Sequence, residues 1–195
     1  KWRLQCPPEF QRPLDFAQLA NAAKAKLVLD WPRQWHEHET DDEFKGLFII
    51  GHTGSGKTRV VQHLLKSHFL LDPSSSVTWF SQNDFHERIL EHFSFGEDAT
   101  DRRTGRLSEF LYEAKEAELV VFDDIAKLRL SARIATEFHS LLDYRTREWR
   151  PLMFTSTVNP RESMRRCLGK DFDARGEELV RRVQQHCTPI NFDLP

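Results

Sequence analysis

The sequence contains no long apolar run and few cysteines. No stretch approaches the roughly 18 apolar residues that a membrane-spanning helix needs, and residues 1–6 lack the apolar segment of a secretory signal. Cys6, Cys167 and Cys187 are widely spaced, which fits neither a disulfide framework nor paired zinc ligands. We therefore expect a cytoplasmic protein with reduced thiols and no membrane contact.

The chain also lacks an excess of charge of one sign. Its formal net charge of −2 excludes a uniformly basic coat for nucleic acid. The charge is unevenly distributed, because residues 145–182 hold nine arginines and one lysine against six acids. Any nucleic-acid surface is therefore expected to be local.

The pattern of apolar residues predicts an arm followed by one α/β core. Residues 1–43 carry scattered prolines, a helix-like stretch over 14–29 and an acidic segment, and they are interpreted as an arm with one helix. Residues 44–195 alternate short apolar runs with amphipathic segments, which is typical of a parallel sheet with crossover helices. The predicted strands are 46–50, 77–80, 119–122, 152–155 and 188–192, and the predicted helices are 58–70, 83–93, 106–116, 132–149 and 175–186. This predicts a three-layer α/β/α core with five strands. Pro189 indicates either that the last strand is an edge strand or that it starts late.

A glycine-rich phosphate loop follows the first predicted strand. The loop is Gly51-His52-Thr53-Gly54-Ser55-Gly56-Lys57-Thr58, a G-x-x-x-x-G-K-T motif that leads into a helix. Glycines let backbone N–H groups point at phosphates, and the helix N-terminus adds a favourable dipole. Lys57 is expected at the β- and γ-phosphates and the Thr58 hydroxyl on Mg²⁺, whereas His52, Thr53 and Ser55 could be spacers. The cofactors predicted are ATP and Mg²⁺.

Two carboxylates follow the third predicted strand. Residues 119–122 are apolar and end in Asp123 and Asp124, at the edge where parallel sheets bind ligands. Asp123 is predicted to hold Mg²⁺, and Asp124 is predicted to orient or deprotonate the attacking water. The alternative interpretation is an ordinary acidic turn after a strand.

Polar residues also follow the fourth predicted strand. The segment Ser156-Thr157-Val158-Asn159 would lie beside the two carboxylates, where a side chain could bond the γ-phosphate or the lytic water. Thr157 is the first choice for this role and Asn159 the second. Polar residues are common after any strand, so an ordinary polar turn without a role at the nucleotide is about equally good an interpretation.

The combined motifs resemble the AAA+ superfamily and, within it, the helicase-loader and transposition-helper family typified by DnaC and IstB. The resemblance covers residues 47–192 and rests on GLFIIGHTGSGKT, VTWFSQNDF, AELVVFDDIAKL, LLDYRTREWRPLMFTSTVN and GEELVRRVQQHCTPINF. It implies an ATPase whose core ends without a C-terminal lid. It also implies that Arg182 reaches the ATP of a neighbouring subunit, although Arg181 could do so instead, or both could simply solvate a helix. Thr155-Ser156-Thr157 departs from the Thr-Ser-Asn of the family.

The resemblance further implies a homo-oligomer that works with a replicative helicase or a transposase, and with single-stranded or duplex DNA. The DNA contact is expected at a local basic patch over residues 101–106, with Phe93 or Phe95 stacking on a base, unless this stretch is an ordinary surface turn. Two other functions stay open. One is a P-loop kinase for a small molecule, and the other is a nucleotide-switched scaffold with little hydrolysis.

Overall fold

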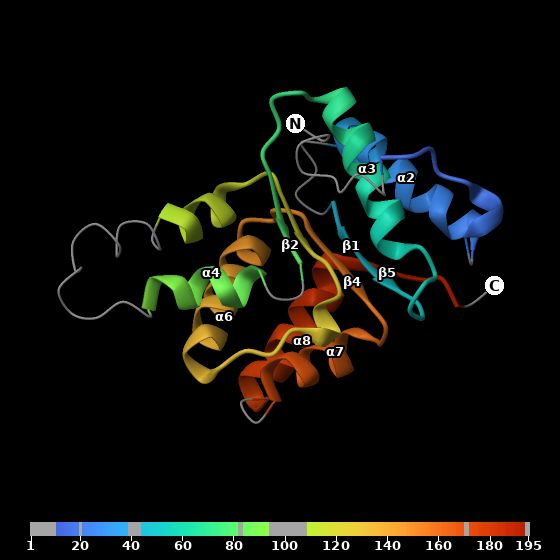
Figure 1. Ribbon diagram of the computed structural model, residues 1–195. Helices are drawn as coiled ribbons and strands as arrows, with labels where there is room; N and C mark the ends of the chain where they lie inside the picture. Colours follow the sequence, from blue (N-terminus) through green and yellow to red (C-terminus); the bar gives the residue numbers. More distant parts are fainter. Residues whose placement is uncertain are drawn as a thin grey trace.

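The computed structural model describes residues 11–19, 21–38, 44–81, 84–93, 109–169 and 172–193 (Figure 1). The strands are β1 (Gly46–Ile50), β2 (Val77–Phe80), β3 (Leu119–Phe122), β4 (Leu152–Ser156) and β5 (Cys187–Asn191). The helices are α2 (Ala22–Glu37), α3 (Lys57–Leu71), α4 (Asp84–Phe93), α6 (Ala132–Arg147), α7 (Pro160–Leu168) and α8 (Ala174–His186), with a further helical stretch over residues 109–116. Two 3₁₀ turns, η2 (Phe16–Gln18) and η4 (Ile125–Lys127), complete the set. No described helix is both long and apolar enough to span a lipid bilayer.

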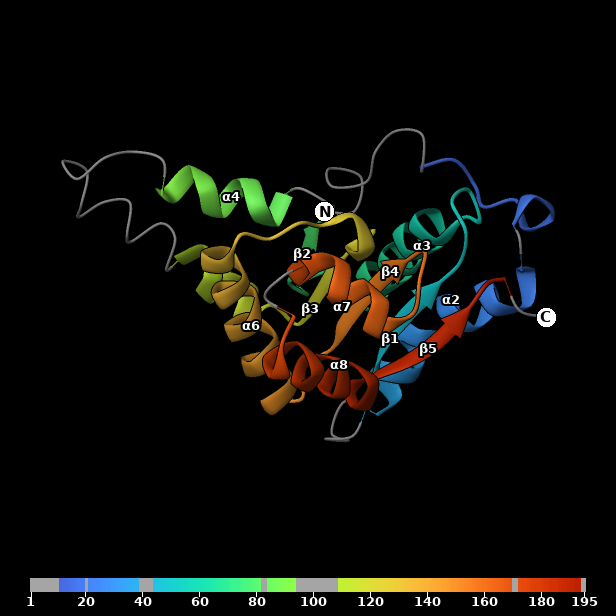
Figure 2. The same ribbon diagram turned by 90° about the horizontal axis from the view of Figure 1, so that it is seen from below.

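The five strands form one parallel sheet in the order β2-β3-β4-β1-β5 (Figure 2). All five therefore point the same way, and their carboxyl ends meet at one edge of the sheet. This arrangement confirms the predicted parallel α/β architecture. It also confirms that the strand containing Pro189 is an edge strand.

Alternating side chains on the strands build two apolar layers. Phe48, Phe122 and Phe154 point to the side covered by α4, α6, α7 and α8. Ile49 and Val121 point to the side covered by α2 and α3. Figure 1 shows the two groups of helices on opposite sides of the sheet. Burial on both faces explains why the strands are continuous apolar runs rather than alternating ones.

The N-terminal helix lies further along the chain than the sequence indicates. The prediction over residues 14–29 is wrong, because α2 runs from Ala22 to Glu37 and includes Pro32. Its start is set by Asn21, whose side-chain oxygen accepts from the Lys24 N–H at 3.0 Å. An interior proline costs about 3 kcal/mol, but the buried Val28 and Trp31 on the same helix pack against the sheet and α3. This burial offsets the hydrogen bond lost at the proline.

The last strand and the helix after β4 also differ from the prediction. The last strand covers Cys187–Asn191 rather than 188–192. Helix α7 was not predicted at all, although Asn159 caps it, Pro160 opens it and Gly169, with φ of +58°, ends it. These three residues are ordinary helix boundary signals. The helix was missed because Asn159 had been interpreted as a candidate ligand of the γ-phosphate or the lytic water.

A buried arginine fixes the segment that leads into β3. The Arg145 side chain is fully buried, and its guanidinium donates to the carbonyl oxygens of Ala114 at 3.0 Å, Ala117 at 2.6 Å and Pro151 at 2.7 Å. The first two acceptors end the helix over residues 109–116, and the third precedes β4. Arg145 thereby holds the starts of two neighbouring strands in register, and their ends carry the polar residues described next.

Candidate nucleotide-binding site

The glycine-rich loop connects the end of β1 to the first turn of α3. Gly54 and Gly56 have φ angles of +86° and +91°, a left-handed conformation that other residues rarely adopt. Lys57 is the first residue of α3, so the loop N–H groups and the helix N-terminus face the same space. The chain therefore forms the strand-loop-helix cradle that the motif predicts.

The Lys57 side chain is folded into this cradle. Its ammonium donates to the Gly51 carbonyl oxygen at 2.7 Å and to the His52 carbonyl oxygen at 3.0 Å. The residue is 8% exposed, and burial lowers the pKa of its ammonium group. The hydrogen-bond partners of this buried cation are neutral groups, so it gains from an anionic ligand such as a phosphate that bonds it directly.

Hydrogen bonds from two elements converge on the Asp123 carboxylate, which directly follows β3. The Thr58 hydroxyl, from α3, lies 2.9 and 3.1 Å from its two oxygens. The Thr155 hydroxyl, from β4, donates to Asp123 Oδ1 at 2.6 Å. Burial raises the pKa of Asp123, and these two hydrogen bonds act in the opposite direction. A carboxylate next to a threonine hydroxyl is the kind of oxygen donor set that Mg²⁺ prefers, so the residues fit the predicted metal.

Asp124 adopts a left-handed conformation with φ of 58° and ψ of 43°. Its backbone N–H donates to the Thr155 hydroxyl at 2.8 Å, which holds this turn against β4. One carboxylate oxygen pairs with the Lys127 ammonium at 2.6 Å. The other, Oδ1, is buried and has no hydrogen-bond partner among the described residues. Strained backbone and an unpaired buried acceptor are expected at a site completed by a ligand or water.

A pocket of about 400 Å³ lies beside Asp123 and is lined by the residues that surround it. Its lining contains Gln18, Leu19, Thr53, Gly54, Gly56, Lys57, Thr58, Arg59, Asp124, Thr155 and Thr157. The lining comes from the phosphate loop, from the ends of β3 and β4, and from the chain around η2. The structure therefore brings together residues that the sequence interpretation assigned separately to phosphate, metal and water.

The two sensor candidates occupy different surroundings. Thr157 lines the pocket. The Asn159 side-chain oxygen instead accepts from the Glu162 N–H at 2.9 Å and caps α7. A role for either residue at the γ-phosphate stays a prediction, and only Thr157 is placed at the pocket.

Arg182 lies on α8, outside the residues that line this pocket. Its guanidinium forms ion pairs with Asp143 at 2.9 Å and Glu178 at 2.7 Å. The neighbouring Arg181 is exposed. The assignment of Arg182 to the ATP of another subunit stays a prediction, and it requires these ion pairs to rearrange.

Sequence reasoning missed three contacts at the site. Thr155 links Asp123 to Asp124, and it faces α3 because side chains alternate along β4. Leu19 lies against the loop, since a Cβ added to Gly56 would come within 2.6 Å of Leu19 Cδ2. Asp193 accepts from the His52 backbone N–H at 3.0 Å and lies 2.6 Å from His52 Nδ1. Of the three, only the contacts of Thr155 could have been found from the sequence, because a threonine within an apolar strand, one residue from its end, is a recognisable signal.

The predicted DNA patch over residues 101–106 lies outside the described residues, as does Phe95. The side chain of Phe93, at the end of α4, is likewise not described. This patch therefore stays a prediction from the sequence.

Comparison with known structures supports the fold. The structure of DnaI superposes with a TM-score of 0.70 at 18% identity, covering 95% of this chain and 94% of that one. The structure of the replication initiator DnaA bound to AMPPCP and single-stranded DNA superposes with a TM-score of 0.67 at 19% identity, covering 97% of this chain and 51% of that one. The structure of the DnaC helicase loader superposes with a TM-score of 0.62 at 19% identity, covering 92% of each chain. No curated protein sequence matched significantly.

A family model confirms the superfamily that the motifs indicate. The model described as AAA domain (dynein-related subfamily) matches residues 46–181. This range begins at β1 and includes the phosphate loop, both carboxylates and the end of β4. The chain therefore belongs to the AAA domain family, as an AAA+ protein with the fold of DnaI, DnaC and DnaA.

Proposed function

We propose that the protein binds ATP with Mg²⁺, hydrolyses it, and uses this cycle to control an interaction in DNA replication. The observation that carries the proposal is the arrangement of Lys57 and Thr58, from α3, beside Asp123 at the end of β3, next to a pocket that both α3 residues line. Family membership supports nucleotide binding, and the DnaA neighbour is named as bound to the ATP analogue AMPPCP.

Each residue has a defined task in this proposal. Lys57 would leave the loop carbonyls and neutralise charge on the β- and γ-phosphates. Thr58 and Asp123 would hold Mg²⁺, which supplies charge neutralisation at the transferring phosphate. The free Oδ1 of Asp124 would accept a hydrogen bond from the attacking water and then its proton. Thr157 would hydrogen-bond the γ-phosphate, with Asn159 the weaker candidate because it already caps α7.

The structural neighbours support the partners that we propose. DnaC is named as a helicase loader, and similarity to it favours a loader of a replicative helicase over a transposition helper. We infer a homo-oligomer in which Arg182 of one subunit reaches the ATP of the next, and a DNA contact through the basic patch over residues 101–106. An arginine supplied in this way would make hydrolysis depend on assembly.

A nucleotide-switched scaffold is the second candidate. Two observations favour it: one Asp124 oxygen is paired with Lys127, and Arg182 is paired within its own chain. Arg182 would need to leave its ion pairs before it could reach another subunit, and Asp124 has only its Oδ1 free for the attacking water. ATP could then fix a conformation that recruits a partner, with little turnover.

One assay separates these functions. Phosphate release is measured against protein concentration, with and without single-stranded DNA and with small-molecule acceptors. Specific activity that rises with concentration and DNA supports the proposal. Tight ATP binding without turnover supports the scaffold, and phosphate appearing on an acceptor at constant specific activity would show a small-molecule kinase instead.

A further inference from the structure

A segment of the chain before α2, residues 11–19, lies against the helix that follows the phosphate loop. The Arg59 guanidinium donates from Nη2 to the Pro13 carbonyl oxygen at 2.8 Å, and His63 Nε2 lies 3.0 Å from the Arg12 carbonyl oxygen. Arg59 and His63 are four residues apart on α3, so they occupy one face of this helix. That face of α3 therefore holds the segment.

The end of this segment forms part of the nucleotide pocket. Gln18 and Leu19 line the pocket together with Arg59. Leu19 also lies against the phosphate loop, because its Cδ2 atom occupies the space that a Cβ on Gly56 would need. A ligand in the pocket is therefore within reach of both the segment and α3.

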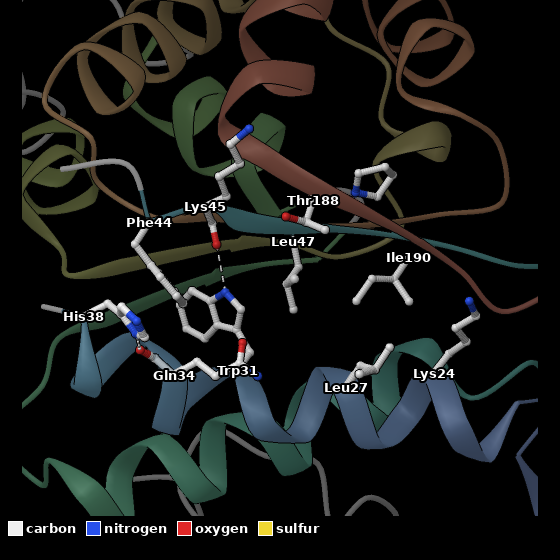
Figure 3. A pocket seen from close by; sticks show the side chains of 11 residues that line it. Lys24, Leu27, Trp31, Gln34, His38, Phe44, Lys45, Leu47, Thr188 and Ile190 are labelled. Carbon is white, nitrogen blue, oxygen red and sulfur yellow. Dashed lines mark hydrogen bonds between the residues drawn. The ribbon is translucent and has the colours of Figure 1, made fainter. Parts of the chain in front are cut away.

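The helix after the segment is fixed to the sheet. The Trp31 indole N–H donates to the Lys45 carbonyl oxygen at 2.9 Å, which joins α2 to the start of β1 (Figure 3). Val28 of α2 is also fully buried in the apolar layer against α3. The segment differs, because Arg12, Pro13 and the η2 turn are exposed. A ligand that acts on the segment is therefore expected to leave α2 in place.

Arg59 has hydrogen-bonding capacity that the described residues do not use. Its Nε atom is buried and has no hydrogen-bond partner among them. Its guanidinium also forms no ion pair with a carboxylate in the part of the chain that the structure describes. An unsatisfied buried donor is costly, and the planar guanidinium of arginine is well suited to phosphate. Arg59 therefore favours an anionic ligand in the pocket that it lines.

The position of Arg59 on α3 indicates which phosphate it can reach. The Thr58 hydroxyl faces Asp123. Arg59 is the next residue, so its side chain leaves the helix about 100° further round, on the side of Pro13. In the proposed function Mg²⁺ and the γ-phosphate lie beside Thr58 and Asp123. Because the phosphates of ATP form a linear chain across the loop, the α-phosphate lies on the side of Arg59.

We propose that Arg59 binds the α-phosphate of the nucleotide through its Nε–H while its Nη2 keeps the Pro13 carbonyl, so that nucleotide binding stabilises residues 11–19 against α3. One rigid guanidinium then bonds both groups, and each contact fixes the orientation that the other needs. By thermodynamic linkage, the positioned segment strengthens nucleotide binding by the same factor. The inference rests on the proposed function and adds a residue and a linked segment to its site.

The first test compares ligands that do and do not fill the α-phosphate position. Isothermal titration with Mg²⁺ measures binding of a non-hydrolysable ATP analogue, tripolyphosphate and pyrophosphate to the wild type and to Arg59→Met. Affinity for the analogue and for tripolyphosphate should fall by about tenfold or more, because a charge-assisted hydrogen bond is lost. Pyrophosphate in the β- and γ-positions leaves the α-position empty, so its affinity should stay within about threefold of the wild type.

The second test is hydrogen exchange of residues 11–19, measured by mass spectrometry. The amides of Ala17, Gln18 and Leu19 are hydrogen-bonded within the segment, so their exchange reports its opening. Tripolyphosphate should slow this exchange in the wild type, because the link runs through Arg59 and needs no nucleoside. In Arg59→Lys the charge remains but the planar fork is lost, so tripolyphosphate should bind without slowing the exchange.

Arg165→Met is the matched control. Arg165 is exposed on α7, pairs with Glu162 at 2.9 Å and does not line the pocket. Its replacement should change neither the affinities nor the exchange of the segment. Arg59 is half-buried, so thermal unfolding followed by circular dichroism should show that both Arg59 variants are folded at the temperature of the titrations. If Arg59→Met is not folded there, Arg59→Lys carries the test through its exchange.

Four results would overturn the role of Arg59. They are unchanged affinity of Arg59→Met for the analogue and tripolyphosphate, a loss confined to the analogue, an equal loss for pyrophosphate, and exchange that tripolyphosphate slows as much in Arg59→Lys as in the wild type. A loss confined to the analogue would mean that Arg59 acts only through the segment on the nucleoside.

Failure of the proposed function has another signature. A wild type that binds neither the analogue nor tripolyphosphate would refute the ATP site and, with it, the role of Arg59. A wild type that binds both ligands while Arg59→Met binds them equally well would refute only the role of Arg59.

Discussion

The nucleotide pocket and the surroundings of Arg182 differ in how much of each is completed by a single chain. At the pocket, hydrogen bonds already connect α3, β3 and β4 through Thr58, Asp123 and Thr155. Around Arg182, the guanidinium is neutralised by Asp143 and Glu178 of its own chain and lies outside the pocket lining. Under the proposed function, ATP binding is therefore expected of one subunit, whereas fast hydrolysis is expected to require a second.

The largest effect is expected when the arginine is removed. In Arg182→Ala, turnover at concentrations that support assembly should fall by about a thousandfold, as when an arginine supplied in trans is lost, while ATP affinity stays unchanged. Steady-state phosphate release and equilibrium ATP binding measure the two properties. Arg181→Ala is the matched control, and a loss of turnover there instead of in Arg182→Ala would reassign the role to Arg181.

A substitution in the phosphate loop should act on ATP affinity, whereas Arg182→Ala should act on turnover. Lys57→Ala should lower ATP affinity by about a hundredfold, because one or two charge-assisted hydrogen bonds of about 1.5–3 kcal/mol each are lost. Lys26→Ala, an exposed lysine on α2, serves as the control. Fluorescence titration with a labelled ATP analogue measures the affinity at low protein concentration. An affinity within twofold of the wild type would contradict the placement of phosphate at this loop.

Substitutions at Thr155 test whether its hydrogen bonds to Asp123 and to the Asp124 N–H hold the pocket in its active geometry. Thr155→Val keeps the shape but removes the hydroxyl that bonds Asp123 and the Asp124 N–H, and hydrolysis should fall by about tenfold. Thr155→Ser retains the hydroxyl and should keep most of the activity. Single-turnover hydrolysis with saturating Mg²⁺ and ATP makes the comparison. Equal rates in the valine and serine variants would show that the hydroxyl only fills space.

The smallest effect concerns pH. Burial raises the pKa of Asp123 above that of an ordinary aspartate, so protonation begins at higher pH in the folded protein. In the proposed site Mg²⁺ binds the ionised carboxylate, so the Mg²⁺-dependent gain in ATP affinity should be complete above this raised pKa and disappear as the pH falls through it. Thr155→Val should move the midpoint to higher pH, because a hydrogen bond to the charged form is lost. ATP titrations at several pH values, with and without Mg²⁺, measure the midpoint.

The sequence predicts the catalytic edge of the sheet well because its signals are local. The G-x-x-x-x-G-K-T loop and the two carboxylates after β3 need only their own strand to place them. The contacts of Thr155 depend on strand order, which brings β4 beside β3. The position of α2 depends on packing against α3, and this packing overrides the signal of Pro32. The ion pairs of Arg182 depend on how α8 meets α6, which no motif describes.

The central claim is that Lys57, Thr58 and Asp123 form an ATP site that requires Mg²⁺. Isothermal titration with a non-hydrolysable ATP analogue tests it, in the presence and absence of Mg²⁺, for the wild type and for Asp123→Asn. Mg²⁺ should strengthen binding by the wild type by about tenfold or more and have little effect on Asp123→Asn. Equal strengthening in both proteins, or no binding by the wild type, would contradict this site.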